Sequence, residues 1–144
     1  MSRDPDGAYR HYVDGEWIDG DGAETFQSHN PANGETLGTF QRGTESDVER
    51  AVDAATAAES EWQAMSHTDR AEYLWDIYHE LKDRHEELGE IVTKVCGKEI
   101  SEGKADVTVA GHMVEWGAGN ARHPHGDVVP SEISSKDAYM RSQP

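Results

Sequence analysis

Cysteine is nearly absent from this sequence, since its 144 residues include only Cys96. One cysteine excludes an intramolecular disulfide and fits a reducing compartment. Long apolar runs are missing too: no stretch approaches the roughly 18–20 apolar residues of a membrane-spanning helix. The opening MSRDPDGAYRHY lacks the charged-then-apolar pattern of a secretion signal. We therefore expect a cytoplasmic protein that does not enter a membrane.

Positive charge is also scarce. Five Lys and eight Arg face 29 acidic residues, and the formal net charge is -16. Such a chain repels DNA, RNA and anionic membranes, so we expect none of them as partners. The acids are spread along helix faces and turns, as on a solvated surface. Because salt screens self-repulsion, we expect a halophilic source; an ordinary acidic cytosolic protein is the alternative.

Apolar residues make up only 35% of the chain, and the mean hydropathy of -0.85 leans toward disorder. Four Trp, five Tyr and clearly periodic segments nevertheless indicate a folded chain. The length is sufficient for one domain with a modest core.

Two strand pairs are predicted near the N-terminus. Asp14-Gly15 separates the β-forming pairs Tyr12-Val13 and Trp17-Ile18, and both turn residues tolerate the positive φ of a tight hairpin. Farther along, Phe26 and residues 37–40 flank the turn sequence PANG, which predicts a second pair.

Three helices follow. Thr44 and Asp47 resemble a capping box, and five apolar residues then share one helical face: Val48, Ala51, Val52, Ala55 and Trp62. The second helix is expected to start at Ser66 and end at Gly97, with a break or bend near residues 83–85.

The third helix is predicted from residue 101 or 102 to about 121, with five buried residues: Val107, Ala110, Met113, Val114 and Gly117. The sequence DAYMRSQP then predicts a last strand. The strands at both ends would have unpaired edges, and an isolated hairpin is marginal in water. The sequence therefore resembles part of something larger.

Cys96 is the obvious candidate nucleophile, but its surroundings argue against that role. A reactive thiol needs a base, a cation or a helix N-terminus to form the thiolate. Cys96 falls at a helix C-terminus, where the helix dipole disfavours the thiolate. Lys94 and Lys98 could compensate, but no base is nearby. We predict an incidental small residue.

No other motif supplies a site. His123 and His125 are two ligands at most, and a zinc site takes three or four. The pair Gly97-Lys98 lacks both the earlier glycine and the following Ser or Thr of a phosphate-binding loop. The residues alone therefore predict no catalytic constellation.

From Tyr12 onward, the sequence resembles the N-terminal part of the NAD(P)-dependent aldehyde dehydrogenase superfamily. The similar stretches come in the family's order: YVDGEWID, NPANGETLGTF, DVERAVDAATAAESEW, the long run ending in VCGKEISE, MVEWGAGNARHPHGDVVP and AYMRSQP. The resemblance implies an α/β fold with an incomplete Rossmann-like cofactor domain. Residues 1–43 would form the hairpin segment, 44–122 the helical part of the cofactor domain, and 123–144 the exit loop and first strand of the oligomerisation arm.

The resemblance implies an enzyme in which a thiolate attacks an aldehyde, hydride passes to NAD or NADP, and water releases the acid. Its nucleophilic cysteine, glutamate base, cofactor turn and oxyanion asparagine would all lie beyond Pro144, so this chain would carry no catalytic, cofactor-binding or metal residue. Val109 and Met113 would line the substrate tunnel; an ordinary packed helix face is the alternative.

Two positions depart from the family pattern. Val95 replaces the acidic residue at which some members bind a monovalent cation, and Glu99 replaces the usual proline after Gly-Lys.

We expect an inactive fragment whose partner is the remainder of the fold, with a homo-oligomer if the fold is complete. The alternatives are an assembly subunit that pairs with a separately encoded remainder or an intact relative, and an independent acidic module.

Overall fold

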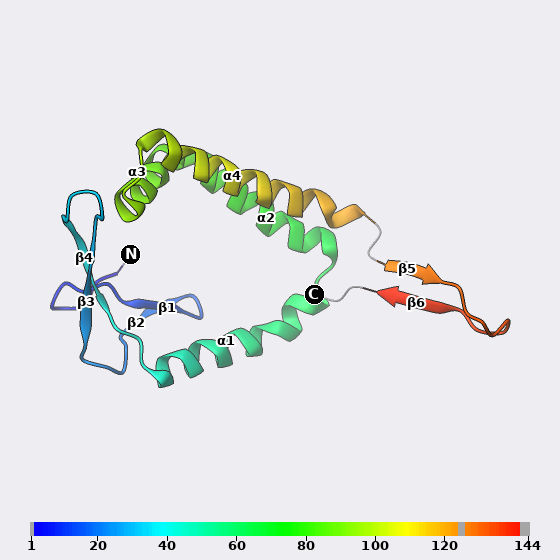
Figure 1. Cartoon of the computed structure of the whole chain (residues 1–144). Helices are drawn as coiled ribbons and strands as arrows, with labels where there is room; N and C mark the ends of the chain where they lie inside the picture. The colour runs from blue at the N-terminus through cyan, green and yellow to red at the C-terminus, as the bar shows by residue number, and fades with distance from the viewer. Residues whose placement is uncertain (1, 124–125, 142–144) are drawn as a thin grey trace.

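The computed structural model describes residues 2–123 and 126–141 (Figure 1). Its strands and helices follow one another as β1 (His11–Val13), β2 (Glu16–Ile18), β3 (Thr25–His29), β4 (Thr36–Gln41), α1 (Glu45–Ala64), α2 (His67–Asp83), α3 (His85–Cys96), α4 (Ile100–Gly119), the 3-10 turn η1 (Asn120–Arg122), β5 (Gly126–Val129) and β6 (Ala138–Arg141). The strands form three separate antiparallel pairs, β1–β2, β3–β4 and β5–β6.

Both predicted strand pairs at the N-terminus are present. Asp14 and Gly15 adopt positive φ values of 53° and 79°, which closes the β1–β2 hairpin as expected. The segment before β1 runs alongside β4, where the Tyr9 N–H donates to the Thr39 carbonyl at 2.9 Å. The Tyr9 and Phe26 rings stack on Phe40, with centroids 5.0 and 5.7 Å away. These aromatic contacts hold the N-terminal segment on the second hairpin.

Helices α1 and α2 begin where the capping signals predict. The Thr44 hydroxyl accepts the Asp47 N–H at the start of α1, and the Ser66 hydroxyl accepts the Asp69 N–H at the start of α2. The expected break at residues 83–85 falls at Arg84, whose φ of -101° and ψ of 18° separate α2 from α3. The helices therefore number four rather than three among the described residues.

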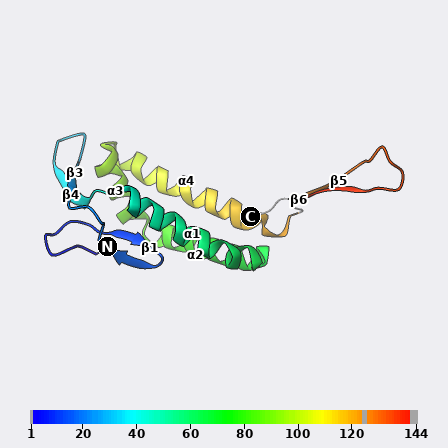
Figure 2. The same cartoon turned by 90° about the horizontal axis from the view of Figure 1, so that it is seen from below.

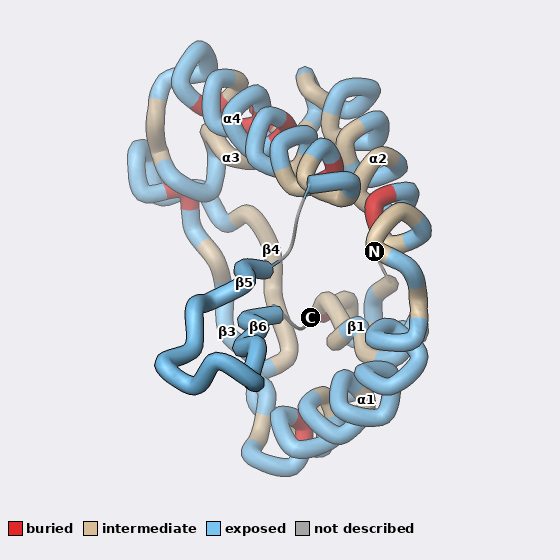
Figure 3. The backbone as a smooth tube through the Cα atoms, turned by 90° about the vertical axis from the view of Figure 1, so that its right-hand side faces the viewer, coloured by how far each residue is buried: buried red, intermediate tan, exposed pale blue. Residues whose placement is uncertain are grey.

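Helices α2, α3 and α4 pack together, while α1 runs apart from them (Figures 1 and 3). In the view of Figure 2, α1 lies in front of α2. Helices α3 and α4 come close together at Gly89 and Gly103. A Cβ on Gly103 would lie 2.6 Å from the Gly89 carbonyl oxygen, closer than real Cβ atoms come. The two backbones therefore pack without an intervening side chain.

The buried core is small (Figure 3). Its apolar members are Ala8, Ala71, Val107 and Ala118. The prediction that α4 buries Ala110 and Met113 was wrong, because Ala110 is exposed and Met113 is 65% exposed. Val107, predicted on the same face, is buried, and Val114 and Gly117 are half-buried, so α2 and α3 cover only part of the predicted face.

The C-terminal segment was also expected to hold one strand, and the structure has two. Strand β5 pairs with β6 through the register Gly126–Arg141 to Val129–Ala138. Every residue of both strands is exposed, and the hairpin projects away from the helices (Figure 1). Within residues 2–123 and 126–141, no helix is long and apolar enough to cross a membrane.

Candidate functional site

Cys96 is the last residue of α3 and is exposed. Both flanking lysines are engaged elsewhere: Lys94 lies 3.8 Å from Glu90, and Lys98 lies 2.5 Å from Asp106. The hydrogen bond from Lys98 to Asp106 raises the pKa of Lys98. The thiol has no hydrogen-bond partner among the described residues. Lys98 interacts electrostatically with Cys96 but is held by Asp106, and no described side chain is hydrogen-bonded to the thiol as a base.

The sequence singled out His123 and His125 as a pair of histidines. His123 is exposed, and His125 lies outside the described residues. In the described part of the chain, no group of three or more His, Cys, Asp or Glu side chains is placed to hold a metal ion.

Gly97 ends α3 against the turn that joins β3 to β4. Its φ of 69° is left-handed, and a Cβ there would lie 2.7 Å from Pro31 Cγ and 3.0 Å from the Ala32 main-chain N. Asn30 is buried and shapes this turn, because its side-chain Oδ1 accepts the Ala32 N–H at 2.9 Å. Gly97 therefore allows a close backbone contact between α3 and the turn, while Lys98 binds Asp106. Val95, near the end of α3, is 52% exposed.

Val109 and Met113 lie four residues apart on the outer face of α4. They are 54% and 65% exposed, and Trp116, at the same helical spacing, is 73% exposed. None of the three is covered by another described element. Sequence reasoning singled out the first two and missed Trp116, which the same spacing could have added.

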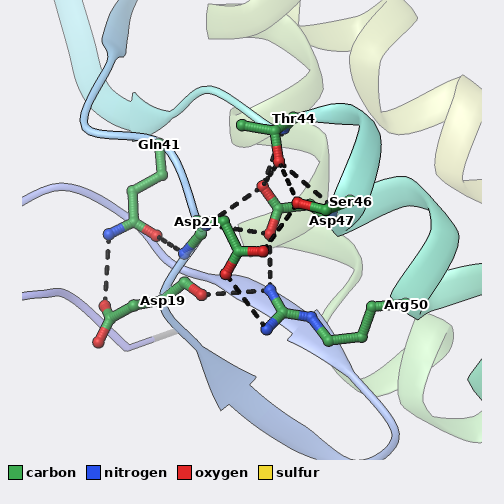
Figure 4. Close-up of polar contacts among 8 residues, drawn as sticks. Asp19, Asp21, Gln41, Thr44, Ser46, Asp47 and Arg50 are labelled. Atoms are coloured by element: carbon green, nitrogen blue, oxygen red, sulfur yellow. Dashed lines mark hydrogen bonds and ion pairs between the residues drawn. The ribbon is translucent and has the colours of Figure 1, made fainter.

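The best-connected polar cluster surrounds Asp47 (Figure 4). The Asp47 carboxylate is only 7% exposed and accepts the N–H and the hydroxyl of Thr44, each at 2.8 Å. It also accepts the main-chain N–H of Asp21, and Arg50 donates to Oδ1 at 2.6 Å. The Ser46 hydroxyl donates to Asp21 at 2.7 Å. These bonds join the segment after β2 to the first turn of α1.

The hydrogen bonds from Thr44, with smaller contributions from Asp21 and Arg50, lower the pKa of Asp47 from 3.8 to about 2. A carboxylate this firmly ionised and saturated with donors is not available as a general base near neutral pH. Sequence reasoning found the Thr44–Asp47 cap but missed Asp21, because nothing in the local sequence pairs residues 26 positions apart.

A cavity of about 510 Å³ lies where α2, α3 and α4 meet. His85 lines it and bridges two helices, with Nε2 3.0 Å from both the Lys104 carbonyl oxygen and Thr108 Oγ1. Lys104 Nζ lies 2.5 Å from Glu86, and its hydrogen bond lowers the pKa of Glu86. His85 therefore acts as a packing residue with satisfied polar contacts.

The helix N-termini are not free to bind phosphate. Each of the four helices has acidic residues in its first turn: Glu45 and Asp47 in α1, Asp69 in α2, Glu86 and Glu87 in α3, and Glu102 in α4. Their carboxylates complement the positive ends of the helix dipoles and repel a pyrophosphate. In the described part of the chain, the four helix N-termini are therefore occupied by the chain's own carboxylates.

Comparison with known proteins places these features in a family. The model of the aldehyde dehydrogenase family matches residues 17–144. Glutarate-semialdehyde dehydrogenase of Pseudomonas putida is 30% identical over 133 residues, which are 92% of this chain and 28% of that protein. Succinate-semialdehyde dehydrogenase [NADP(+)] of Escherichia coli is 29% identical over 132 residues, covering 92% of this chain and 27% of that protein.

Comparison with solved structures gives the same family. A point mutant of betaine aldehyde dehydrogenase from Staphylococcus aureus, in complex with NAD+, superposes with a TM-score of 0.85 and 30% identity. The match covers 96% of this chain and 28% of that one. The chain thus spans little more than a quarter of its relatives' length, and its architecture is the N-terminal portion of their fold. It belongs to the aldehyde dehydrogenase family.

Proposed function

We propose that this chain supplies a non-catalytic, N-terminal part of an NAD(P)-dependent aldehyde dehydrogenase. The complete enzyme oxidises an aldehyde or semialdehyde to the carboxylic acid. The proposal is supported by the two semialdehyde dehydrogenases among the relatives and by the NAD+ complex of the betaine aldehyde enzyme.

The observation that carries the non-catalytic role is the chemistry of the polar groups. The lone thiol of Cys96 has no base, and the most strongly perturbed carboxylate, that of Asp47, is saturated with structural hydrogen bonds. The helix N-termini are complemented by the chain's own acids. These groups stabilise the fold, and none is free to bind a nicotinamide dinucleotide or attack a carbonyl.

Calorimetric titration of the purified chain with NAD+ and with NADP+ tests this assignment. We expect no saturable binding of either dinucleotide. Saturable binding that persists at high salt would overturn the non-catalytic assignment, because the chain would then contain a cofactor site of its own.

Val109 and Met113 are proposed to form part of the substrate tunnel wall in the complete enzyme. Their exposure on one face of α4 supports this role, since nothing else in the described chain covers them. Their replacement by Ala in the complete enzyme should change KM for long or bulky aldehydes and leave KM for acetaldehyde nearly unchanged. Equal changes for both aldehydes would indicate an ordinary packed helix face instead.

We also place the chain in a salt-rich cytoplasm. The formal charge of -16 favours an environment in which repulsion is screened, and an exposed free thiol is maintained in reducing surroundings. The division into residues 1–43, 44–122 and 123–144, with the last as an oligomerisation arm, remains a prediction.

A second candidate function is that of a separate assembly subunit. The small core and the exposed apolar faces of α1, α4 and the β5–β6 hairpin favour it. An immunoblot of the source cells with antibodies to this chain separates the two candidates. A band at 15.9 kDa indicates a separate subunit, and a band several times heavier indicates that the remainder is part of the same polypeptide.

A further inference from the structure

An apolar groove lies between the β1–β2 hairpin and the first half of α1. We call it the hairpin groove; its volume is about 440 Å³. The hairpin contributes Tyr12, Val13 and Ile18, and α1 contributes Val48, Ala51, Val52 and Ala55. A shallower extension continues along α1 past Ala54 to Ala58. Seven of the eleven lining residues are therefore apolar, and the groove fits apolar side chains; the other four are His11, Gly43, Asp47 and Arg50.

The walls remain open to solvent. Tyr12 is 60% exposed, Val48 is 61% exposed and Val52 is 57% exposed. These residues belong to the apolar face of α1, which an amphipathic helix normally buries against a neighbour. In the described chain, no helix packs along α1, and Figures 1 and 3 show it apart from α2 and α4.

Polar contacts hold α1 at its two ends and leave its middle free. At the N-terminal end, Arg50 and Asp47 bind the Asp21 segment. At the other end, Arg70 donates to the carbonyls of Trp62 and Met65 at 3.2 and 2.9 Å. Hydrogen bonds at both ends of α1 therefore hold the groove walls in place, and an occupant can enter the open middle without unfolding α1.

We propose that the hairpin groove is an assembly surface that receives apolar side chains of a polypeptide carrying the rest of the aldehyde dehydrogenase fold. This inference rests on the proposed function. The same architecture, at a TM-score of 0.85, forms 28% of a chain in the staphylococcal enzyme, so the fold occurs within a larger body. That body is the occupant to which we commit.

Two other occupants of the hairpin groove, a second copy of this chain and a small apolar ligand, are disfavoured. Two copies of a chain with a formal charge of -16 repel one another, which disfavours a second copy. A small apolar ligand would cover only the groove and leave the neighbouring apolar residues exposed. The exposed apolar residues continue beyond it to Trp62 at the end of α1 and to Tyr73 and Ile77 on α2. A surface of that extent requires a macromolecular partner.

The test uses the full chain and a defined probe in concentrated KCl. The probe is the part of the S. aureus betaine aldehyde dehydrogenase that does not superpose on this chain, produced as a separate polypeptide. Ala55→Glu and Ala57→Glu form a matched pair: both positions are exposed on α1, but only Ala55 lines the groove. Val52→Glu gives a second groove variant, and circular dichroism checks that each variant keeps its helices.

We expect the wild-type chain and Ala57→Glu to bind the probe equally, and both groove variants to bind at least about tenfold more weakly, because each would bury an unpaired carboxylate. No wild-type complex, or equal binding by Ala55→Glu and Ala57→Glu, would overturn the assembly surface. A dimer of the chain alone that Ala55→Glu dissociates would also overturn it, in favour of a second copy. NAD+ binding by the chain alone would instead overturn the proposed function.

Discussion

The main-chain N–H of Asp21 donates to both carboxylate oxygens of Asp47, 3.1 Å from Oδ1 and 3.3 Å from Oδ2. This pair joins the segment after the first hairpin to the first turn of α1. The same carboxylate caps α1 through Thr44 and binds Arg50. One side chain thus closes the helix end and fixes the helix against the hairpin.

Replacing Asp47 by Ala should therefore lower the midpoint of denaturant unfolding and shorten α1, because it removes the cap and the bond to Asp21 together. Thr44→Ala removes only part of the cap and should cost about 1 kcal/mol. Asp53→Ala is the control, since Asp53 is exposed on the same helix and makes no polar contact with another described side chain. Equal midpoints for Asp47→Ala and Asp53→Ala would contradict this role.

Acid should unfold the chain partly through Asp47. Its pKa lies near 2 in the folded chain against an ordinary value of 3.8, so the folded state holds this proton less tightly than the unfolded state. The contribution is fully present above about pH 4 and is lost as the pH falls toward 2. Helical circular dichroism across this range should show a flatter loss of stability for Asp47→Asn than for the wild type. Parallel curves would exclude Asp47 as the titrating group.

Substitutions at Gly97 and Gly34 distinguish the energetic cost of a left-handed backbone from the cost of a steric clash. Both have positive φ, 69° and 75°, but only Gly97 has neighbours within 4 Å of the Cβ position, at Pro31 and Ala32. Gly34→Ala should cost about 1–2 kcal/mol for the left-handed conformation alone. Gly97→Ala should cost more, because α3 must also move away from the turn. Urea unfolding measures the loss of unfolding free energy for both variants. Similar losses would mean that the turn at Pro31 and Ala32 moves aside without an energetic cost.

The crossing of α3 and α4 should tolerate no added methyl group at Gly103. Because the Gly89 carbonyl is backbone, it cannot rotate away, and Gly103→Ala should destabilise the chain by about 1–3 kcal/mol. At Gly119, the last residue of α4, nothing lies within 4 Å of the Cβ position. Gly119→Ala should be neutral or stabilise by up to about 1 kcal/mol. Thermal unfolding of the two variants should shift in different directions, and a shared direction would contradict the close packing.

Local signals in the sequence were sufficient for several of the element boundaries, although strand β5 was missed. Asp14-Gly15 predicted the first hairpin, Thr44 with Asp47 predicted the start of α1, and Gly97 predicted the end of α3. Each signal works within a few residues, through a turn conformation or a cap. The break near residue 84 was expected as a possibility, and it is real.

Contacts distant in the sequence could not be predicted in the same way. Nothing local relates Asp21 to Asp47, or Gly89 to Gly103, although both contacts position helices. The predicted burial along α4 was correct only in part: Val107 is buried, whereas Ala110 and Met113 are exposed. Periodicity shows which side of a helix is apolar, whereas burial also depends on what lies opposite.

Salt should stabilise this chain strongly. With 29 acidic against 13 basic residues, repulsion opposes compaction, and the screening length falls from about 10 Å in 0.1 M salt to about 3 Å in 1 M salt. The melting temperature should rise steadily with KCl. A variant in which exposed acids of α1, such as Glu49, Asp53 and Glu59, are replaced by the amides should show a smaller rise. A melting temperature independent of KCl would exclude charge repulsion as the main destabilising term.

The central claim is that this part of the aldehyde dehydrogenase fold contributes structure and no reacting group. The most direct measurement is the formation of NADH or NADPH by the purified chain given succinate semialdehyde, glutarate semialdehyde or betaine aldehyde. We predict no turnover and an unmodified Cys96 thiol by intact mass. Turnover at a rate typical of a dehydrogenase, abolished by Cys96→Ser, would contradict the claim.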